Sequence, residues 1–205
     1  MKLRAHVIVT VGVTLLAVAA AAPPTAYGQT DRGLRAPSDF AGILDRAKRS
    51  EALFVEAGKV LQHPRCVNCH PNGDRPLQGT GYPHQPPVQR GDPEGHGVTA
   101  MRCKTCHQKE NFDPGRVPGN REWSLARDTM AWQGKSLAEI CAQVTNRKLN
   151  GDRSVEQIVE HMKTHPLVGW AWNPGAGREP APGTWAAFGA LIEAWSESGA
   201  QCPTR

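Results

Sequence analysis

The sequence contains the five-residue pattern Cys-x-x-Cys-His twice, as CVNCH at residues 66–70 and as CKTCH at residues 103–107. Each copy places two thiols three positions apart and a histidine directly after the second thiol. Four kinds of site use cysteines in this way: a redox dithiol, a zinc site, a disulfide framework, and covalent attachment of haem. The repeated pattern therefore limits the kinds of site that this chain can contain more than the overall composition does.

The histidine separates these four kinds of site. Haem attachment uses both thiols to bond the two vinyl groups of one porphyrin, and the next residue, a histidine, is the proximal ligand of the iron. A redox dithiol needs no histidine and normally lies in an alternating strand and helix pattern, which this sequence lacks. A four-cysteine zinc site would have an unusually long gap between its two pairs and would leave both histidines without a role.

We therefore predict that the chain carries two haem c groups. The two tethers begin only 37 residues apart, which leaves no room for a separate helical domain around each, so both groups should share one protein envelope. The predicted thioether bonds come from Cys66, Cys69, Cys103 and Cys106, and the predicted proximal ligands are His70 and His107.

The residue on the opposite face of each iron decides between electron transfer and chemistry on a bound ligand. His84 lies between Pro83 and Pro86, so its backbone is restricted, which suits a fixed ligand but also suits an ordinary loop residue. His161 is predicted on a capped helix, on one face with His165. Met130 and Met101 are weaker candidates, because thioether ligation is common in such proteins while core packing is the usual role of methionine. The remaining candidates are His63, His96, His165 and Met162.

The N-terminus predicts export from the cytoplasm. Lys2 and Arg4 precede an uncharged stretch at 7–22, and small residues at positions 26 and 28 fit a cleavage site after Gly28. The apolar run is shorter than the roughly 20 residues that cross a bilayer, so we predict a cleaved signal peptide at 1–28 and no membrane span in the mature chain. Residues 29–37 are predicted as a flexible lead-in, and residues 38–205 as a single periplasmic domain.

The net charge of the mature chain supports no nucleic-acid partner. The net charge falls from +5 to +3 on removal of the leader, and the basic residues form no long run. We therefore expect no nucleic-acid binding, whereas docking of a protein with an acidic surface remains open.

The pattern of the remaining chain indicates a mostly α-helical fold with long irregular loops. Ser38 is predicted to begin a first helix leading to Cys66, and Ser136, Ser154 and Thr184 are predicted to cap three later helices. Residues 71–121 are rich in glycine and proline and show neither alternation nor helical periodicity. A stretch of this length without regular structure is suspect in a compact domain unless something else organises it, and a large rigid cofactor could do so.

Cys141 and Cys202 belong to neither motif. In an exported chain two such cysteines are expected to pair, so we predict a disulfide between the helix after Ser136 and the C-terminus.

Four stretches carry a resemblance to a known family: HPRCVNCHPNGDRPLQG, AMRCKTCHQKEN, LVGWAWNPG and GREPAPGTW. At these residues the chain resembles small exported dihaem cytochromes that are often labelled cytochrome subunits of isoquinoline 1-oxidoreductase-type molybdenum hydroxylases. The likeness spans roughly residues 38–203. It implies a protein that passes electrons from a molybdenum hydroxylase towards the respiratory chain.

The sequence thus predicts an electron-transfer protein without substrate chemistry of its own. Two alternatives stay open at this point. One is a dihaem enzyme, peroxidase-like or thiosulfate-oxidising, in which one iron is open and Arg90, Glu94 or His96 assists. The other is a sensor in which loss of a distal ligand reports binding.

Overall fold

The computed structural model describes residues 33–204, and its regular structure is mostly helical. In this part of the chain the α-helices are α1 (Arg46–Leu61), α2 (Pro64–Val67), α3 (Leu137–Thr145), α4 (Val155–Thr164), α5 (Pro166–Trp170) and α6 (Trp185–Glu197). Two short strands, β1 (Leu77–Gln78) and β2 (Tyr82–Pro83), pair antiparallel, with Leu77 opposite Pro83. Four 3₁₀ turns complete the regular structure: Pro37–Phe40, Cys103–Thr105, Asp113–Gly115 and Asp128–Met130. The prediction of a mostly α fold with long loops is confirmed at this level.

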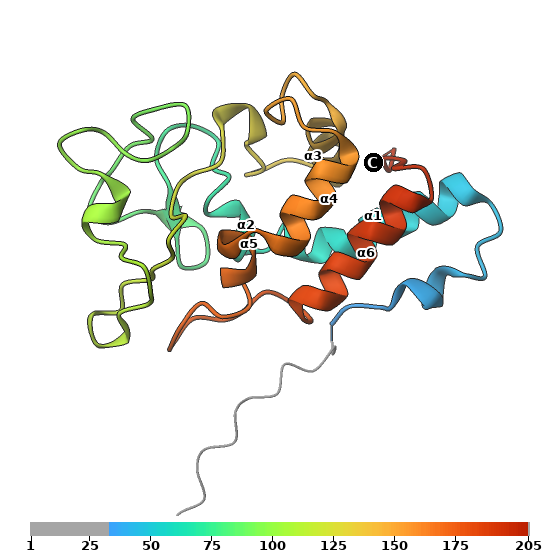
Figure 1. Cartoon of the computed structure of the whole chain (residues 1–205), viewed down its shortest axis with the longest axis horizontal. Coiled ribbons are helices and arrows are strands. Elements are labelled where there is room, and N and C mark those ends of the chain that lie inside the picture. Colours follow the sequence, from blue (N-terminus) through green and yellow to red (C-terminus); the bar gives the residue numbers. More distant parts are fainter. Residues whose placement is uncertain (1–32, 205) are drawn as a thin grey trace, which may run out of the picture.

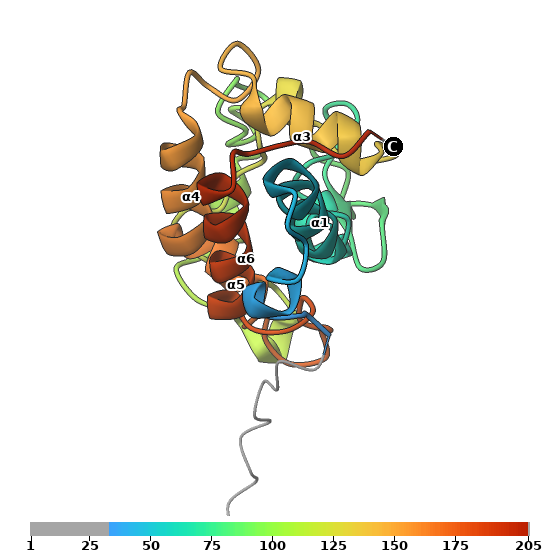
Figure 2. The same ribbon diagram turned by 90° about the vertical axis from the view of Figure 1, so that its right-hand side faces the viewer.

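Helix α6 packs against both α1 and α4, and these three helices form the core of the molecule (Figures 1 and 2). Phe54 of α1 and Trp195 of α6 are fully buried, with ring centroids 5.1 Å apart. Ser50, also buried, donates its hydroxyl to the Trp195 carbonyl at 3.0 Å and accepts the backbone N–H of Gln201 at 2.9 Å. This contact ties the residues that follow α6 back onto α1.

Three of the four predicted helix starts are confirmed. Ser136 and Ser154 form capping boxes with Glu139 and Gln157, and the Thr184 side chain accepts the backbone N–H of Ala187. Each cap supplies an acceptor for a backbone N–H that has no partner inside the helix. The local pattern alone was therefore enough to locate α3, α4 and α6.

The predicted start at Ser38 is wrong. Ser38 lies inside a 3₁₀ turn, and α1 begins only after Asp45, whose carboxylate accepts the backbone N–H groups of Ala47 and Lys48 at 2.9 and 3.1 Å. A carboxylate that satisfies two N–H groups stabilises a helix start at this position. Leu44, which lies between Ser38 and this start, is 92% exposed.

Contacts with the helical core begin before residue 38. Leu34 is buried in the core, and the Arg35 backbone N–H donates to the Glu56 carboxylate of α1 at 2.9 Å. The predicted signal peptide at 1–28 and the first residues of the lead-in lie outside the described residues. Within residues 33–204, none of the helices is long and apolar enough to cross a membrane.

The glycine- and proline-rich segment at 71–121 lies as a set of loops beside the three core helices (green in Figure 1). Arg90 ties this segment to the chain that follows it: its almost fully buried side chain donates to the Gly73 carbonyl inside the segment and to the Ala126 carbonyl beyond it. Gly91 has φ 79°, and a Cβ there would lie 2.3 Å from the Gly97 backbone, so this close approach of two loops requires glycine. Backbone contacts rather than apolar side chains thus organise the loops.

The predicted disulfide between Cys141 and Cys202 is confirmed. It joins α3 to the chain that follows α6, and Cys141 is fully buried. The bond closes a loop of 61 residues across two core helices, so it restricts the unfolded chain considerably.

We expect the double substitution Cys141→Ala and Cys202→Ala to lower the free energy of unfolding by up to about 4 kcal/mol, the loop-closure value for this length. Chemical denaturation of the variant and of the unreduced parent measures the difference. The parent treated with a reducing agent should match the variant, and equal stability of all three samples would contradict the stabilising role.

Candidate functional site

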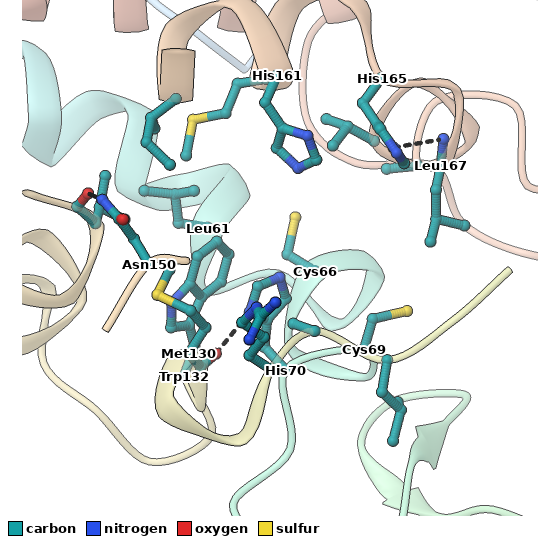
Figure 3. A pocket seen from close by; sticks show the side chains of 18 of the residues that line it. Leu61, Cys66, Cys69, His70, Met130, Trp132, Asn150, His161, His165 and Leu167 are labelled. Atoms are coloured by element: carbon teal, nitrogen blue, oxygen red, sulfur yellow. Dashed lines mark hydrogen bonds between the residues drawn. The ribbon is translucent and has the colours of Figure 1, made fainter. Parts of the chain in front are cut away.

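The first Cys-x-x-Cys-His unit lines a cavity of about 350 Å³ (Figure 3). Helix α1 leads directly into α2, which begins with Pro64 and carries Cys66, and the turn that follows places Cys69 and His70 on the same cavity wall. The backbone N–H of His70 donates to the Val67 carbonyl at 3.0 Å, which closes this turn. Two thiols and one imidazole therefore face a single enclosed space, within the size range of ligand pockets.

The other walls of the cavity come from the helical core. Leu61, Ile158, Met162 and Phe188 contribute apolar surface, while the charged groups at the cavity are three arginines and one carboxylate. Arg65, Arg127 and Arg153 line it together with Glu94. The Nε atom of Arg65 is buried without a hydrogen-bond partner in the structure. A buried guanidinium N–H that lacks an acceptor is suited to the carboxylate of a bound molecule.

His70 is held in one orientation by two contacts. Its Nδ1 lies 2.7 Å from the Met130 carbonyl, and its ring stacks on Trp132 with centroids 3.6 Å apart and planes 9° apart. A carbonyl can only accept, so Nδ1 carries the proton and Nε2 keeps its lone pair. Burial lowers the pKa of His70 to about 4, so the ring is neutral at physiological pH. His70 thus presents a free Nε2, the form in which imidazole binds metals.

The second unit repeats this arrangement. Cys103 lies in a 3₁₀ turn, and the ring of the buried His107 stacks on Trp123 with centroids 4.3 Å apart and planes 13° apart. Its Nδ1 lies 2.7 Å from the Pro118 carbonyl, and burial lowers its pKa below the usual histidine value. His107 therefore also presents a neutral ring with a free Nε2. The second unit differs from the first in exposure, because Cys106 is open to solvent.

The four motif cysteines are free thiols in the structure, and the pair of the first unit does not have the character of a redox dithiol. Burial raises the pKa of Cys66 to about 12 and that of Cys69 to about 11, and burial also raises the pKa of Cys103. Reactive dithiols have lowered pKa values, because the thiolate is the nucleophile. The redox alternative therefore receives no support from the first unit.

Among residues 33–204, no three His, Cys, Asp or Glu side chains gather into a group that could hold a metal ion. Cys66, Cys69, Cys103 and Cys106 thus do not form the four-cysteine zinc site that the spacing left open. A ligand set at either unit would need a partner that supplies further donor atoms, as the nitrogens of a porphyrin do.

His161 projects from α4 into the cavity of the first unit, toward Cys66 and His70 (Figure 3). Burial, followed by the neighbouring His165, lowers the pKa of His161 to about 3. A neutral imidazole therefore enters the cavity from the core helices while His70 enters from the loop side. His161 thus enters the cavity opposite His70, and three other distal candidates named from the sequence also line it: His165, Met130 and Met162.

His165 also borders the cavity, but its hydrogen bond differs. The Leu167 backbone N–H donates to its Nδ1 at 3.3 Å, so the proton of the neutral ring lies on Nε2. Its ring centroid is 4.5 Å from that of His161. His63 has the same arrangement, because its Nδ1 accepts the backbone N–H of Arg65 at 3.2 Å. Both histidines serve as helix N-caps rather than offering a free Nε2.

His84 lies beside the second unit. Its Nδ1 is 2.9 Å from the Pro86 carbonyl, which again leaves Nε2 free, and its ring centroid is 5.9 Å from that of His107. Two imidazoles that each bind one ion at about 2.0–2.1 Å place their rings at a similar separation. His84 is therefore the distal candidate that the structure brings to the second unit.

The three methionine candidates are Met130, Met162 and Met101, and Met162 lines the cavity from α4 beside His161. Met130 lines the cavity, but its carbonyl accepts from His70, which places it on the His70 side. Met101 is 40% exposed and does not line the cavity. Arg90 donates to the backbone carbonyls of Gly73 and Ala126. His96 pairs with Asp92 at 3.4 Å on the surface.

Sequence reasoning missed the partners of the two motif histidines. No sequence pattern identified Trp132 and Trp123 as their stacking partners, because these residues follow the motifs by 62 and 16 positions in irregular chain. The backbone carbonyls of Met130 and Pro118 that accept these hydrogen bonds cannot be identified from residue type, because every residue has a backbone carbonyl. The excess of tryptophan after residue 122 was the only available signal.

Comparison of the chain with protein-family models, with curated proteins and with solved structures gives no match.

We expect the chain produced without haem attachment to react with iodoacetamide slowly at Cys66 and Cys69. At pH 8 their raised pKa values leave at least about a hundredfold fewer thiolates than an unperturbed cysteine has, and the thiolate is the reacting form. The exposed Cys106 should be alkylated first. Peptide mass spectrometry over time measures the order, and the same reaction in denaturant is the control. Equal rates at all four thiols of the folded chain would contradict this expectation.

Proposed function

We propose that the chain is an exported dihaem c-type cytochrome that transfers electrons. The observation that carries this proposal is the repeated environment of His70 and His107. Each ring donates Nδ1–H to a backbone carbonyl at 2.7 Å, stacks on a tryptophan and keeps a free Nε2 beside two unbridged thiols. Nothing in a redox dithiol or a disulfide framework calls for this arrangement, whereas a proximal haem ligand requires its orientation and tautomer.

The residues of the first cavity fit a haem. The cavity is enclosed by apolar core side chains, it has imidazoles on opposite walls, and Arg65 offers a buried N–H without an acceptor to a propionate. In this proposal Cys66, Cys69, His70 and His161 hold one haem, and Cys103, Cys106, His107 and His84 hold the other. The bound haem supplies an iron that takes up and releases one electron.

The protein residues around each site hold the ligands and limit the access of water. The carbonyls of Met130 and Pro118 keep the proton on Nδ1 of the two proximal histidines, which raises the basicity of each ring toward its ligand. Trp132 and Trp123 fix the ring planes by stacking. The neutral state of His161 in the buried cavity leaves it free to occupy the sixth position.

A histidine on each opposite face favours an electron carrier over an enzyme. Such a site has no open position at which peroxide or another substrate could bind. The dihaem enzyme remains the second candidate because Glu94, a carboxylate, borders the first cavity and could act as an acid or base if His161 left the iron.

The donor and the compartment are proposed on other grounds. The N-terminal 28 residues support export to the periplasm, where haem is attached. The resemblance to dihaem subunits of molybdenum hydroxylases supports a molybdenum hydroxylase-type dehydrogenase as the electron donor, with the respiratory chain as the destination.

We expect the protein matured with a haem-attachment system to contain two covalent haems, counted as pyridine haemochrome per chain. The double substitution Cys66→Ser and Cys69→Ser should reduce the count to one, because both thioether bonds of the first site are lost. Cys103→Ser with Cys106→Ser should do the same for the second. The pair Cys141→Ala and Cys202→Ala is the control that keeps two haems. A parent chain without covalent haem would falsify the proposed function.

We expect the reduced protein to be low-spin at both sites and indifferent to carbon monoxide. His161→Ala should open the first site, so that one carbon monoxide binds per chain with the optical change of a newly filled sixth position. His165→Asn is the matched control, since asparagine retains the helix cap and His165 is not a ligand in this proposal. Binding of carbon monoxide by the parent would instead favour the enzyme.

A further inference from the structure

A series of aromatic contacts runs from the second Cys-x-x-Cys-His unit to the cavity of the first. His107 of the second unit stacks on Trp123 at 4.3 Å between ring centroids. Trp123 meets the ring of Trp170 edge to face, with centroids 4.9 Å apart and planes at 85°. Trp170 in turn lines the cavity of the first unit. The side chains of two tryptophans therefore span the protein between the two sites.

Trp170 is held firmly in this place. It is 9% exposed, and its Nε1–H donates to the Asn111 side-chain oxygen at 3.0 Å. The guanidinium of Arg65 lies 5.9 Å from its ring centroid. Asn111 also accepts the backbone N–H of Gly119, the residue after the Pro118 carbonyl that orients His107. The Asn111 side chain thus binds both Trp170 and the turn beside the second site.

We propose that Trp123 and Trp170 form an aromatic bridge through which the two sites exchange electrons. This inference rests on the proposed function. Each exchange moves one electron, so that one site is oxidised and the other reduced, with no bond made or broken and no proton transferred. The contacts are at the ordinary separation of aromatic pairs, so the route contains no gap between the His107 ring and the cavity wall.

The experiment uses the mature dihaem protein, reduced by one electron with pulse-generated methyl viologen radical. The redistribution of that electron between the two haems is followed optically. Trp123→Leu and Trp170→Leu should each slow this step by about tenfold, corresponding to roughly 1.4 kcal/mol in barrier. Trp123→Phe, which keeps an aromatic ring in the stack, should stay within about threefold of the parent. Trp185→Leu, a tryptophan outside the bridge and the cavity lining, is the control and should leave the rate unchanged.

Midpoint potentials and the low-spin spectra of every variant are measured alongside the rate. The bridge is supported if exchange slows in both leucine variants while the midpoint potentials of Trp170→Leu stay at the parent values. If Trp123→Leu also changes the spectrum of the second haem, Trp170→Leu decides the question, because Trp170 does not contact His107. Unchanged exchange in Trp170→Leu, with both haems bound, overturns the bridge and leaves the proposed function intact. Absence of the haems overturns the proposed function itself.

Discussion

The packing of α6 between α1 and α4 is the interaction on which the rest of the molecule depends. Trp195 and Phe54 are buried where α6 meets α1, and Ser50 ties the chain after α6 back onto α1. This core supplies one wall of the cavity through Phe188 and the residues of α4, including His161. The loop region has no comparable apolar core, so it takes its position from contacts with these helices. A site formed between the two parts can therefore exist only when the helices are packed.

The loop region is organised by polar contacts with main-chain groups. Arg90 donates to the carbonyls of Gly73 and Ala126, and the Ala126 backbone N–H donates to the Cys69 carbonyl at 2.9 Å, next to His70. The carbonyls of Met130 and Pro118 then select the tautomer of the two motif histidines. Such contacts hold each imidazole in one orientation and one tautomer, as a metal ligand requires. A bound cofactor would add apolar surface to a region that has little of its own.

Prediction from the sequence succeeded where the signal was local. The caps at Ser136, Ser154 and Thr184 were found because each side chain acts on backbone groups two or three residues away. The pairing of Cys141 with Cys202 followed from their exclusion from the motifs. The start of α1 was misplaced because Ser38 lies inside a 3₁₀ turn, and the carboxylate of Asp45 caps the helix instead.

The sequence by itself determined the chemistry of the candidate sites: the residue types and spacing of the two Cys-x-x-Cys-His units, and a short set of histidines and methionines that could face them. Only the tertiary structure decided which of that set meets which unit. It brought His161 into the first cavity and His84 to 5.9 Å from His107, and it set Trp123 against Trp170. The reason is that these partners are 91, 23 and 47 residues apart along the chain, and contacts at such separations depend on how helices and loops pack, which leaves no local pattern to read.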